Sequence, residues 1–210
     1  MQRVRSFPPI ESSRAQVLIL GSMPGGASLA AGQYYAHPQN LFWRIMGDLL
    51  GAKPGLSYAA RTRLLKANGI ALWDVLESCV REGSLDSSIE EASIAVNDFA
   101  SFYRARPRIA RVFFNGAKAE ASYRRYVLAS ARDAGGPREY FRLPSTSPAH
   151  AALAFEKKRD AWRVVTDSHQ RAAPDSTQDP PRGGAETASA SEKLNSFPVG
   201  NELWRRARCR

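Results

Sequence analysis

Four short apolar segments along the chain predict the strands of a sheet. Residues 16–21 (QVLILG) form a continuous apolar run that ends in glycine, which is typical of a strand buried on both faces of a parallel sheet. Three later segments are also short and largely apolar, and we predict strands there as well: 70–73 (IALW), 111–116 (RVFFNG) and 139–143 (EYFRL).

Segments with helical spacing alternate with these strands. Apolar residues recur at helical spacing from 41 to 50, where Gly51 ends the pattern, and further helices are predicted at 57–68, 117–132 and 155–170. Residues 22–39 are predicted to form a polar, glycine-rich loop. This alternation favours an α/β fold in which helices cover both faces of a parallel sheet. Ligands of such sheets bind at the carboxyl ends of the strands.

The chain is strongly basic. Among its 210 residues are 30 Lys+Arg and 20 Asp+Glu, which gives a net charge of +10. Residues 171–210 hold seven basic and five acidic residues, so the excess in residues 1–170 is +8. Positive charge on the folded part favours a phosphate-bearing partner such as nucleic acid. The alternative is an arginine-rich codon bias without a functional meaning.

Composition also limits the class of protein. The sequence has no run of about 18 apolar residues that would predict a membrane-spanning helix, and the segment after Met1 lacks the apolar core of a secretory signal. Cys79 and Cys209 are the only cysteines, too few for a four-thiolate metal site or a disulfide framework. We therefore expect a cytoplasmic protein.

A change in composition near residue 171 divides the chain. From there on Pro, Gly, Ala, Ser and Thr dominate, and such a segment cannot bury enough apolar surface to fold. We therefore predict a folded domain at 1–170 and a disordered tail at 171–210.

The loop after the first strand has the residues of a ligand pocket. Its glycines allow the backbone to approach a ligand closely, and its proline stiffens the chain. Further along, Tyr34 and Tyr35 offer flat faces on which a base is able to stack. Asn40 precedes the next helix, where asparagine is most commonly an N-cap. The pocket candidates at the start of the loop are Gly21, Ser22, Met23, Pro24 and Gly25.

The loop after the fourth strand, 143–150 (LPSTSPAH), places three hydroxyl groups between two prolines. A rigid turn rich in donors is suited to bind phosphate oxygens, although many ordinary Ser/Pro loops share this composition. The candidates for phosphate contact are Ser145, Thr146, Ser147, Pro148 and His150.

Taken together, these segments resemble a known family. The order GSMPG, QYYAHPQNLFW, GIALWDVL, FFNGAKA and LPSTSPAHA is similar to the uracil-DNA glycosylase superfamily, and within it to the hypoxanthine-DNA glycosylase branch. The resemblance covers about residues 15–165. It implies a three-layer α/β/α sandwich around a four-stranded, mainly parallel sheet.

The activity implied by the resemblance is base excision without a metal or another cofactor. Such a monofunctional enzyme extrudes hypoxanthine (deoxyinosine, the product of adenine deamination) from double- or single-stranded DNA. It then hydrolyses the glycosidic bond and leaves an abasic site, the first step of base excision repair.

Two positions depart from the superfamily pattern. Met23 stands where members that hydrolyse uracil often have Asp or Asn, and Leu143 stands where they often have a base-binding His or Asn. Neither side chain offers that chemistry. In the hypoxanthine branch the catalytic asparagine lies in an HPxN segment, so the resemblance implies that Asn40 is catalytic, a role compatible with capping. Its amide is able to accept from the attacking water or to donate to the departing base, and both roles stay open.

The resemblance also implies roles for the neighbouring side chains. Residues 145–147 are expected to clamp the DNA backbone, and one of residues 148–150 to fill the space left by the base. Tyr35 is expected to lie under the extruded base, with Phe42 as the second candidate. His37 is expected to donate to a phosphate or to water; the alternative is a structural histidine held by the proline that follows.

Asp74, at the end of the second strand, is our candidate for reading the base. A carboxylate accepts a hydrogen bond from N1–H of hypoxanthine but meets only a lone pair at N1 of adenine. Leaving that buried charge unpaired would cost about 1–3 kcal/mol. In the alternative interpretation Asp74 caps the turn that follows the strand.

Other functions fit parts of the sequence. The same fold could act on uracil, xanthine or mismatched thymine, or it could be a non-catalytic DNA-binding module. A nucleotide-binding enzyme is disfavoured, because the first loop lacks both GxGxxG and GxxxxGK[ST]. We expect a monomer associated with the nucleoid of a bacterial-type cytoplasm.

Overall fold

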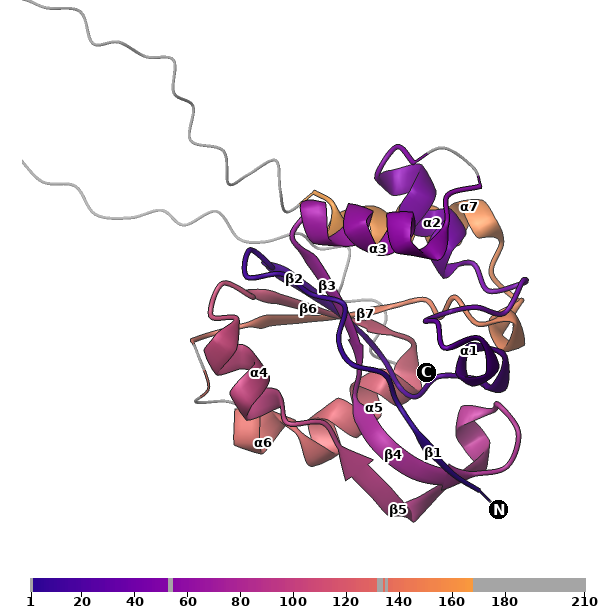
Figure 1. The fold of residues 1–210 in the computed structure, drawn as a ribbon, viewed down its shortest axis with the longest axis vertical. Helices are drawn as coiled ribbons and strands as arrows, with labels where there is room; N and C mark the ends of the chain where they lie inside the picture. Colours follow the sequence, from indigo (N-terminus) through magenta and orange to yellow (C-terminus); the bar gives the residue numbers. More distant parts are fainter. Residues whose placement is uncertain (1, 53–54, 132–133, 135, 168–210) are drawn as a thin grey trace, which may run out of the picture. The chain divides into compact units, whose positions relative to one another are not determined.

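The computed structural model describes residues 2–52, 55–131, 134 and 136–167 (Figure 1). Its centre is a four-stranded sheet in the order β3-β2-β6-β7, and each neighbouring pair is parallel. The strands are β2 (Val17–Gly21), β3 (Ile70–Asp74), β6 (Arg111–Asn115) and β7 (Glu139–Leu143). Each lies within one residue of its predicted segment, so the four predicted strands are confirmed.

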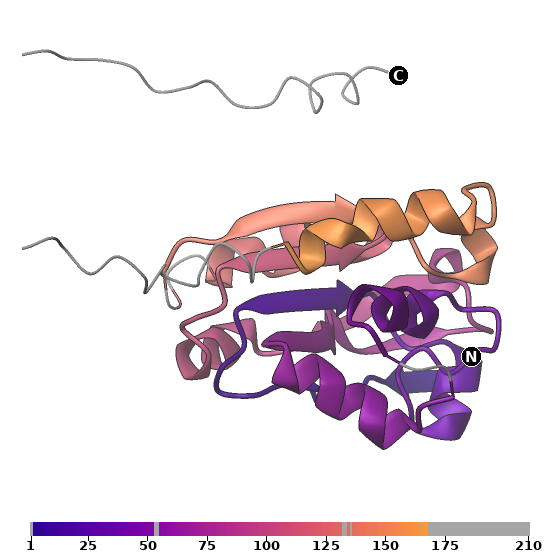
Figure 2. The same cartoon turned by 90° about the horizontal axis from the view of Figure 1, so that it is seen from above.

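Helices cover both faces of this sheet (Figures 1 and 2). One layer holds α2 (Phe42–Leu49), α3 (Tyr58–Ala67) and α7 (Phe155–Trp162). The opposite layer holds α4 (Phe99–Ala105), α5 (Ala117–Tyr126) and α6 (Leu128–Ala131). The expected three-layer α/β/α sandwich is therefore confirmed.

Two predicted helices differ in length from the observed ones. The segment predicted at 117–132 is divided into α5 and α6, which meet at Val127. The helix predicted at 155–170 ends at Trp162 and continues as a single 3-10 turn, Arg163–Val165. The second difference lies at a helix end, where sequence patterns are least informative; the first is a break at Val127 within the predicted helix.

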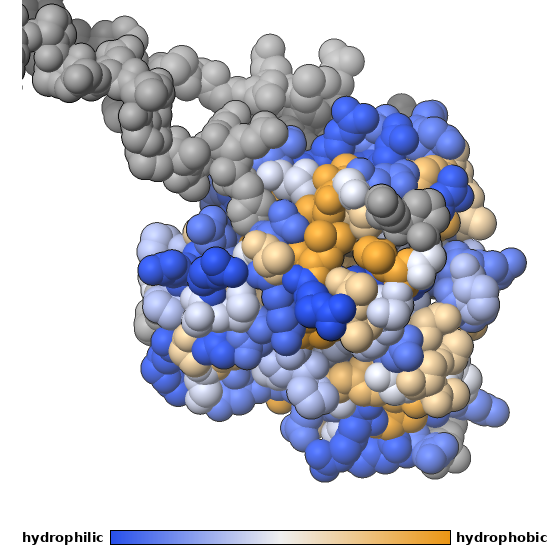
Figure 3. All heavy atoms as spheres, turned by 45° about the horizontal axis from the view of Figure 1, so that its top comes forward, coloured by the Kyte–Doolittle hydropathy of each residue, from blue (hydrophilic) through white to orange (hydrophobic). Residues whose placement is uncertain are grey.

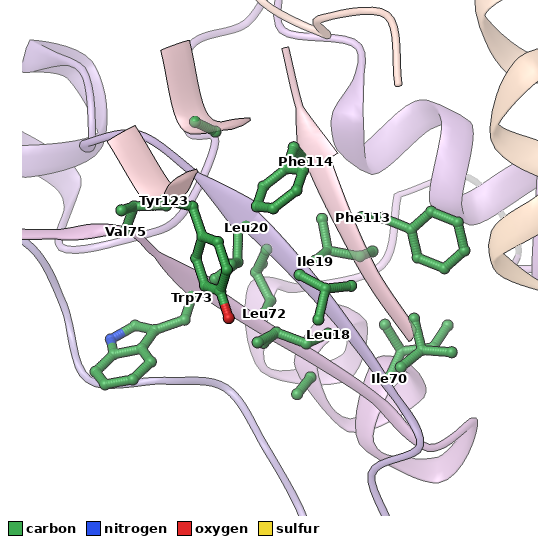
Figure 4. Packing of buried hydrophobic residues seen from close by; sticks show 14 of the residues in the cluster. Leu18, Ile19, Leu20, Ile70, Leu72, Trp73, Val75, Phe113, Phe114 and Tyr123 are labelled. Atoms are coloured by element: carbon green, nitrogen blue, oxygen red, sulfur yellow. The ribbon is translucent and has the colours of Figure 1, made fainter. Parts of the chain in front are cut away.

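The core is centred on β2, which lies between β3 and β6. Val17, Leu18, Ile19 and Leu20 have no exposed surface, because helices cover the strand on both faces (Figures 1 and 2). Figure 4 shows Leu18, Ile19 and Leu20 among other buried side chains of the core. The continuous apolar run at 16–21 thus follows from burial on two sides rather than one.

A second sheet was not predicted from the sequence. It is three-stranded and antiparallel, in the order β1-β4-β5, and consists of β1 (Gln2–Arg5), β4 (Leu76–Arg81) and β5 (Ile89–Val96). Only Val75 separates β4 from β3. The β4–β5 pairing contains register shifts, and charged residues interrupt the apolar pattern of β4, which explains why a simple alternation was absent.

The prediction of an unbroken loop at 22–39 was wrong for six residues. Helix α1 spans Gly26–Ala31 and ends at Gly32, whose φ of +61° is the left-handed conformation that favours glycine. A helix of this length carries too little periodicity to be recognised from its sequence.

Hydrophilic side chains cover most of the face seen in Figure 3, and apolar side chains gather in a smaller area over the upper helices. In the described part of the chain, no helix has the length and apolar character needed to cross a membrane. The tail predicted at 171–210 lies outside the described residues, as does the boundary predicted at 170.

Candidate active site

A cleft with a volume of about 400 Å³ opens at the carboxyl ends of the parallel strands. Its walls come from the loop after β2, the loop between β4 and β5, and the turn after β7. Fourteen of the fifteen candidate residues named from the sequence line this cleft: Gly21, Ser22, Met23, Pro24, Gly25, Tyr35, His37, Asn40, Asp74, Ser145, Thr146, Ser147, Pro148 and His150. Segments more than 100 residues apart in sequence thus meet at one site.

Phe42 is the candidate that does not line the cleft. Its side chain is fully buried at the start of α2, and its ring stacks on that of Tyr35 with 4.2 Å between centroids and 26° between planes. Phe42 therefore supports Tyr35 from behind. Tyr34, the other tyrosine named from the sequence, is 3% exposed, so Tyr35 is the predicted stacking face that is available to a ligand.

Tyr35 has an unusual backbone conformation. Its φ of +53° makes it the only non-glycine residue with positive φ in the described part of the chain. Such a conformation costs on the order of 1–3 kcal/mol and persists only where the surroundings hold it. Its buried hydroxyl has no hydrogen-bond partner among the described residues. The ring is held by packing against Phe42.

Asn40 lies one residue before Leu41, the N-cap of α2, and binds a backbone N–H of the first helical residue with its amide oxygen. Its Oδ1 accepts a hydrogen bond from the backbone N–H of Phe42 at 3.0 Å. No hydrogen bond from Nδ2 is formed within the described residues, and the side chain lines the cleft. The capping interpretation is therefore supported, and the amide nitrogen remains available as a donor.

The loop that carries Asn40 is joined to the turn after β7. The backbone N–H of Leu41 donates to the carbonyl of Thr146 at 3.0 Å, and the N–H of Asn40 donates to the carbonyl of His37 at 2.9 Å. His37 itself is exposed, and its Nδ1 accepts from the N–H of Gln39 at 3.2 Å. This bond supports a structural role for His37 and leaves Nε2 for a phosphate or water.

Asp74 is a buried carboxyl group at the floor of the cleft. It is 3% exposed, and its Oδ2 accepts a hydrogen bond from the Ser6 hydroxyl at 2.7 Å. Burial raises the pKa of Asp74 to about 7, against the lowering effect of the Ser6 bond. Its backbone carbonyl accepts from the Asn97 side chain at 2.8 Å, and within the described ranges its carboxylate accepts no capping bond from the turn that follows.

This raised pKa makes a prediction about stability. The Asp74 carboxyl ionises near 3.8 when unfolded and near 7 when folded, so between these values the folded protein binds more protons than the unfolded chain. The stability that Asp74 contributes is therefore lost as pH rises through about 7. Asp74→Asn does not titrate. We therefore expect its free energy of unfolding, relative to that of wild type, to be higher at pH 8 than at pH 5. Urea unfolding at both values measures this difference; a pH-independent difference would contradict it.

The turn after β7 is held from below by Asn115 at the end of β6. The Asn115 amide donates to the Thr146 hydroxyl, and its oxygen accepts the Thr146 N–H, both at 2.9 Å. Thr146 is fully buried, so it shapes the turn instead of presenting its hydroxyl to solvent. The other two predicted clamp residues, Ser145 and Ser147, are half-buried. Their hydroxyl oxygens accept from the backbone N–H groups of Ser147 and Ala149 at 3.2 and 3.3 Å, which leaves the O–H groups as donors.

Helix α7 anchors the far end of the same turn. Lys158 is 1% exposed, and its Nζ donates to the carbonyl of His150 at 2.6 Å. The indole N–H of Trp162 donates to the carbonyl of Pro144 at 3.0 Å. Pro148, Ala149 and His150 thus project into solvent from a turn that is fixed at both ends.

Sequence reasoning missed the wall formed by the loop between β4 and β5. Arg81, at the end of β4, is 2% exposed and donates from Nη2 to the carbonyl of Pro24 at 2.6 Å. Ser22 donates to Asp86 at 2.7 Å, and the N–H of Gly26 donates to the Ser84 hydroxyl at 2.8 Å. No motif signalled these contacts, since they join segments about 60 residues apart.

Across the described ranges, no three His, Cys, Asp or Glu side chains come together as a group that could hold a metal ion. Two buried nitrogens of Arg81, Nε and Nη1, have no hydrogen-bond partner among the residues that the structure describes, and the charge of Arg81 acts on Asp74. The site is thus built from amide, hydroxyl, carboxyl and aromatic groups around a cleft of limited size.

These features define the class of protein. A parallel α/β sheet between helical layers, with its ligand cleft at the strand ends, is a ligand-binding α/β domain. The family model of the Uracil DNA glycosylase superfamily matches residues 8–166, and the chain belongs to this superfamily. The family resemblance drawn from the motifs is therefore confirmed.

Individual relatives are also similar to this chain in sequence and in structure. A hypoxanthine DNA glycosylase from Methanosarcina acetivorans is 36% identical over 163 residues, which cover 77% of this chain and 96% of the relative. Another from Methanosarcina barkeri is 40% identical over 115 residues, 54% of this chain and 72% of the relative. The solution NMR structure of a candidate uracil DNA glycosylase from M. acetivorans superimposes with a TM-score of 0.67 at 32% identity, covering 80% of this chain and 99% of that one.

Proposed function

We propose that this protein is a DNA glycosylase that excises hypoxanthine from DNA and leaves an abasic site. The observation that carries the proposal is the Asn40 amide, which lies in an HPQN segment at the cleft with a free nitrogen. Relatives named hypoxanthine DNA glycosylase, at 36% and 40% identity, support the choice of base. The basic chain, with a net charge of +10, suits a DNA substrate.

The proposed reaction breaks the bond between C1′ of the sugar and N9 of the base. The base leaves the stack and enters the cleft against the Tyr35 ring. The bonding electrons pass to the purine as the sugar gains oxocarbenium character. A hydrogen bond from Asn40 Nδ2 stabilises the charge on the departing purine. Water then forms the new bond to C1′, and its proton leaves to solvent or to the purine.

Backbone contacts complete the proposed complex. Ser145 and Ser147, which are half-buried, bind phosphates beside the extruded nucleotide through their O–H groups, and residues 148–150 approach the space that the base has left. One cleft holds one base, so we propose that the protein acts as a monomer, on nucleoid DNA in the cytoplasm.

Single-turnover cleavage of labelled oligonucleotides tests this function. Duplexes and single strands carrying hypoxanthine, uracil, xanthine, adenine or a thymine–guanine mismatch are incubated with EDTA and then cleaved at abasic sites with alkali. We expect selective release of hypoxanthine that EDTA does not affect. Preferred release of another base would reassign the substrate, and DNA binding without release of any base would leave a non-catalytic binding module.

Asp74 is proposed to select hypoxanthine over adenine. Asp74→Asn replaces an acceptor by a group that is also able to donate to the lone pair at N1 of adenine. We expect the ratio of hypoxanthine to adenine excision at pH 8, where the wild-type carboxyl is ionised, to fall by about tenfold or more. Asp98→Asn, at the exposed N-cap of α4, is the matched control. An unchanged ratio of hypoxanthine to adenine excision would contradict this role for Asp74.

A further inference from the structure

A second cavity, with a volume of about 590 Å³, adjoins the cleft at the loop that carries Asn40. Its walls come from α2, α3 and the segment 33–40, and we call it the α2–α3 groove. Three residues, Tyr35, His37 and Asn40, line both the groove and the cleft. The HPQN segment thus forms the ridge between two neighbouring hollows.

The α2–α3 groove combines an apolar floor with a basic rim. Arg44 of α2 and Arg61 of α3 line it, and Asp48 is the single carboxylate among its described lining residues. The floor consists of buried and half-buried apolar side chains: Trp43, Met46, Leu50, Leu56, Leu64 and Leu65. The groove therefore suits a ligand that has both an apolar part and a negative charge.

Aromatic rings hold both guanidinium groups in place. Cζ of Arg44 lies 3.7 Å from the centroid of the Phe155 ring, and Cζ of Arg61 lies 5.9 Å from that of the Trp43 ring. A cation–π contact orients an arginine and leaves its N–H groups able to donate. No carboxylate in the described part of the chain forms an ion pair with either arginine. Both groups are thus positioned to bind an anion.

A nucleotide has the chemistry that this groove matches. Its base buries apolar surface, and its phosphate carries the charge that arginine binds. Proteins that bind single strands combine the same two features, a basic groove and side chains on which bases pack. The cavity volume is also in the range of sites for small ligands. Because the groove adjoins the cleft, a strand whose damaged base occupies the cleft is able to place a neighbouring nucleotide there.

We propose that the α2–α3 groove binds the nucleotide next to the lesion in the damaged strand. This inference rests on the proposed function for the identity of the strand, and it adds a subsite built by two helices beside the cleft. Arg44 and Arg61 donate to the phosphate, and the base packs on the apolar floor. The neighbour has to leave its own stack to reach the groove, so the subsite favours single-stranded DNA over duplex DNA.

Binding of an undamaged single strand tests the subsite without requiring excision. Fluorescence anisotropy gives the Kd of a labelled oligonucleotide at several salt concentrations. Arg44→Ala and Arg61→Ala are each expected to raise the Kd about three- to tenfold and to make its dependence on log salt shallower by about 0.7, for the loss of one phosphate contact. Arg63→Ala removes the same charge from an exposed position of α3 that does not line the groove, and it is the matched control with a nearly unchanged Kd.

Truncated substrates show on which side of the lesion the neighbour lies. Hypoxanthine is placed at the centre of a single strand or next to its 5′ or 3′ end, and the half-saturating protein concentration for excision is measured. For wild type, loss of the nucleotides on one side is expected to raise this concentration about tenfold or more, since the base and its phosphate are both lost. The effect of that truncation is expected to shrink in Arg61→Ala, because part of the contact is already gone.

Two results would overturn the subsite. The first is an equal Kd for Arg44→Ala, Arg61→Ala and the Arg63→Ala control. The second is a fully additive loss from Arg61→Ala and from truncation on either side, because the substitution would then act elsewhere. Failure of wild type to release hypoxanthine from any strand would overturn the proposed function instead, while the Kd values would still decide whether the groove binds DNA.

Discussion

Replacing Asn40 with alanine is expected to lower the single-turnover rate of hypoxanthine excision by about 10²- to 10³-fold, the usual cost of removing one positioned donor from an active site. The side chain lines the cleft, and its Nδ2 has no partner in the described part of the chain. The same change removes the bond that caps α2, so stability should fall by about 0.5–2 kcal/mol.

A second substitution separates these two effects. Asn40→Asp keeps an oxygen that accepts the Phe42 N–H but replaces the donating nitrogen by another acceptor. We expect this variant to retain the stability of wild type and to lose activity as alanine does. Gln39→Ala, an exposed neighbour in the same loop, is the matched control with unchanged rate and stability.

The result would also decide between the two roles that the sequence left open for the amide. An active Asn40→Asp variant would contradict donation to the base and assign Asn40 to positioning water through its oxygen. A fully active Asn40→Ala variant would leave only the capping role. Rates are measured by alkaline cleavage of labelled oligonucleotides, and stability by urea unfolding of the same samples.

The parts of the structure that could be predicted from the sequence are the strands whose residues are buried on both faces of the sheet. Val17–Gly21 is enclosed on both faces, and its continuous apolar run indicates this directly. Once the four strands were recognised as parallel, their carboxyl ends had to lie at one edge of the sheet. This rule was enough to predict that the loop after residue 21 and the turn after residue 143 meet at one site.

The parts that could not be predicted depend on long-range contacts. Nothing in the sequence around Arg81 indicates burial, yet Arg81 is buried and donates to the carbonyl of Pro24, 57 positions away. Leu85 reads as a loop residue, and its place at the cleft follows from the path of the β4–β5 hairpin. Neither contact has a local pattern, because the partner residues belong to a different sheet or loop.

The orientation of side chains within a motif was likewise beyond the sequence. Tyr35 and Phe42 are both aromatic candidates for stacking, and the start of α2 decides which one faces the cleft. Thr146 lies between two serines of similar chemistry but is turned inward onto Asn115. A motif thus identifies the segment that forms a site, while the packing of the segment selects the residues that face it.

Gly21→Ala is expected to damage both stability and activity, although its backbone has no need of glycine, since its φ is not positive. A Cβ at this position would lie 2.3 Å from Asp74 Oδ1 and 3.0 Å from the Tyr35 hydroxyl. Asp74 is buried and bound to Ser6, and Tyr35 is stacked on Phe42, so neither has room to retreat. Overpacking of this kind costs about 1–3 kcal/mol, and displacement of Asp74 and Tyr35 should lower the excision rate by about tenfold or more.

The control for this prediction is another glycine with space around it. A Cβ at Gly47 in α2 would lie 3.9 Å from its nearest neighbour, Ala52, so Gly47→Ala should keep activity and gain up to about 1 kcal/mol in stability. A double-mutant cycle then tests the cause. In an Asp74→Ala background the closest contact is gone, so the stability cost of Gly21→Ala should shrink. If the stability cost of Gly21→Ala is the same in both backgrounds, the collision with Asp74 is not the source of that cost.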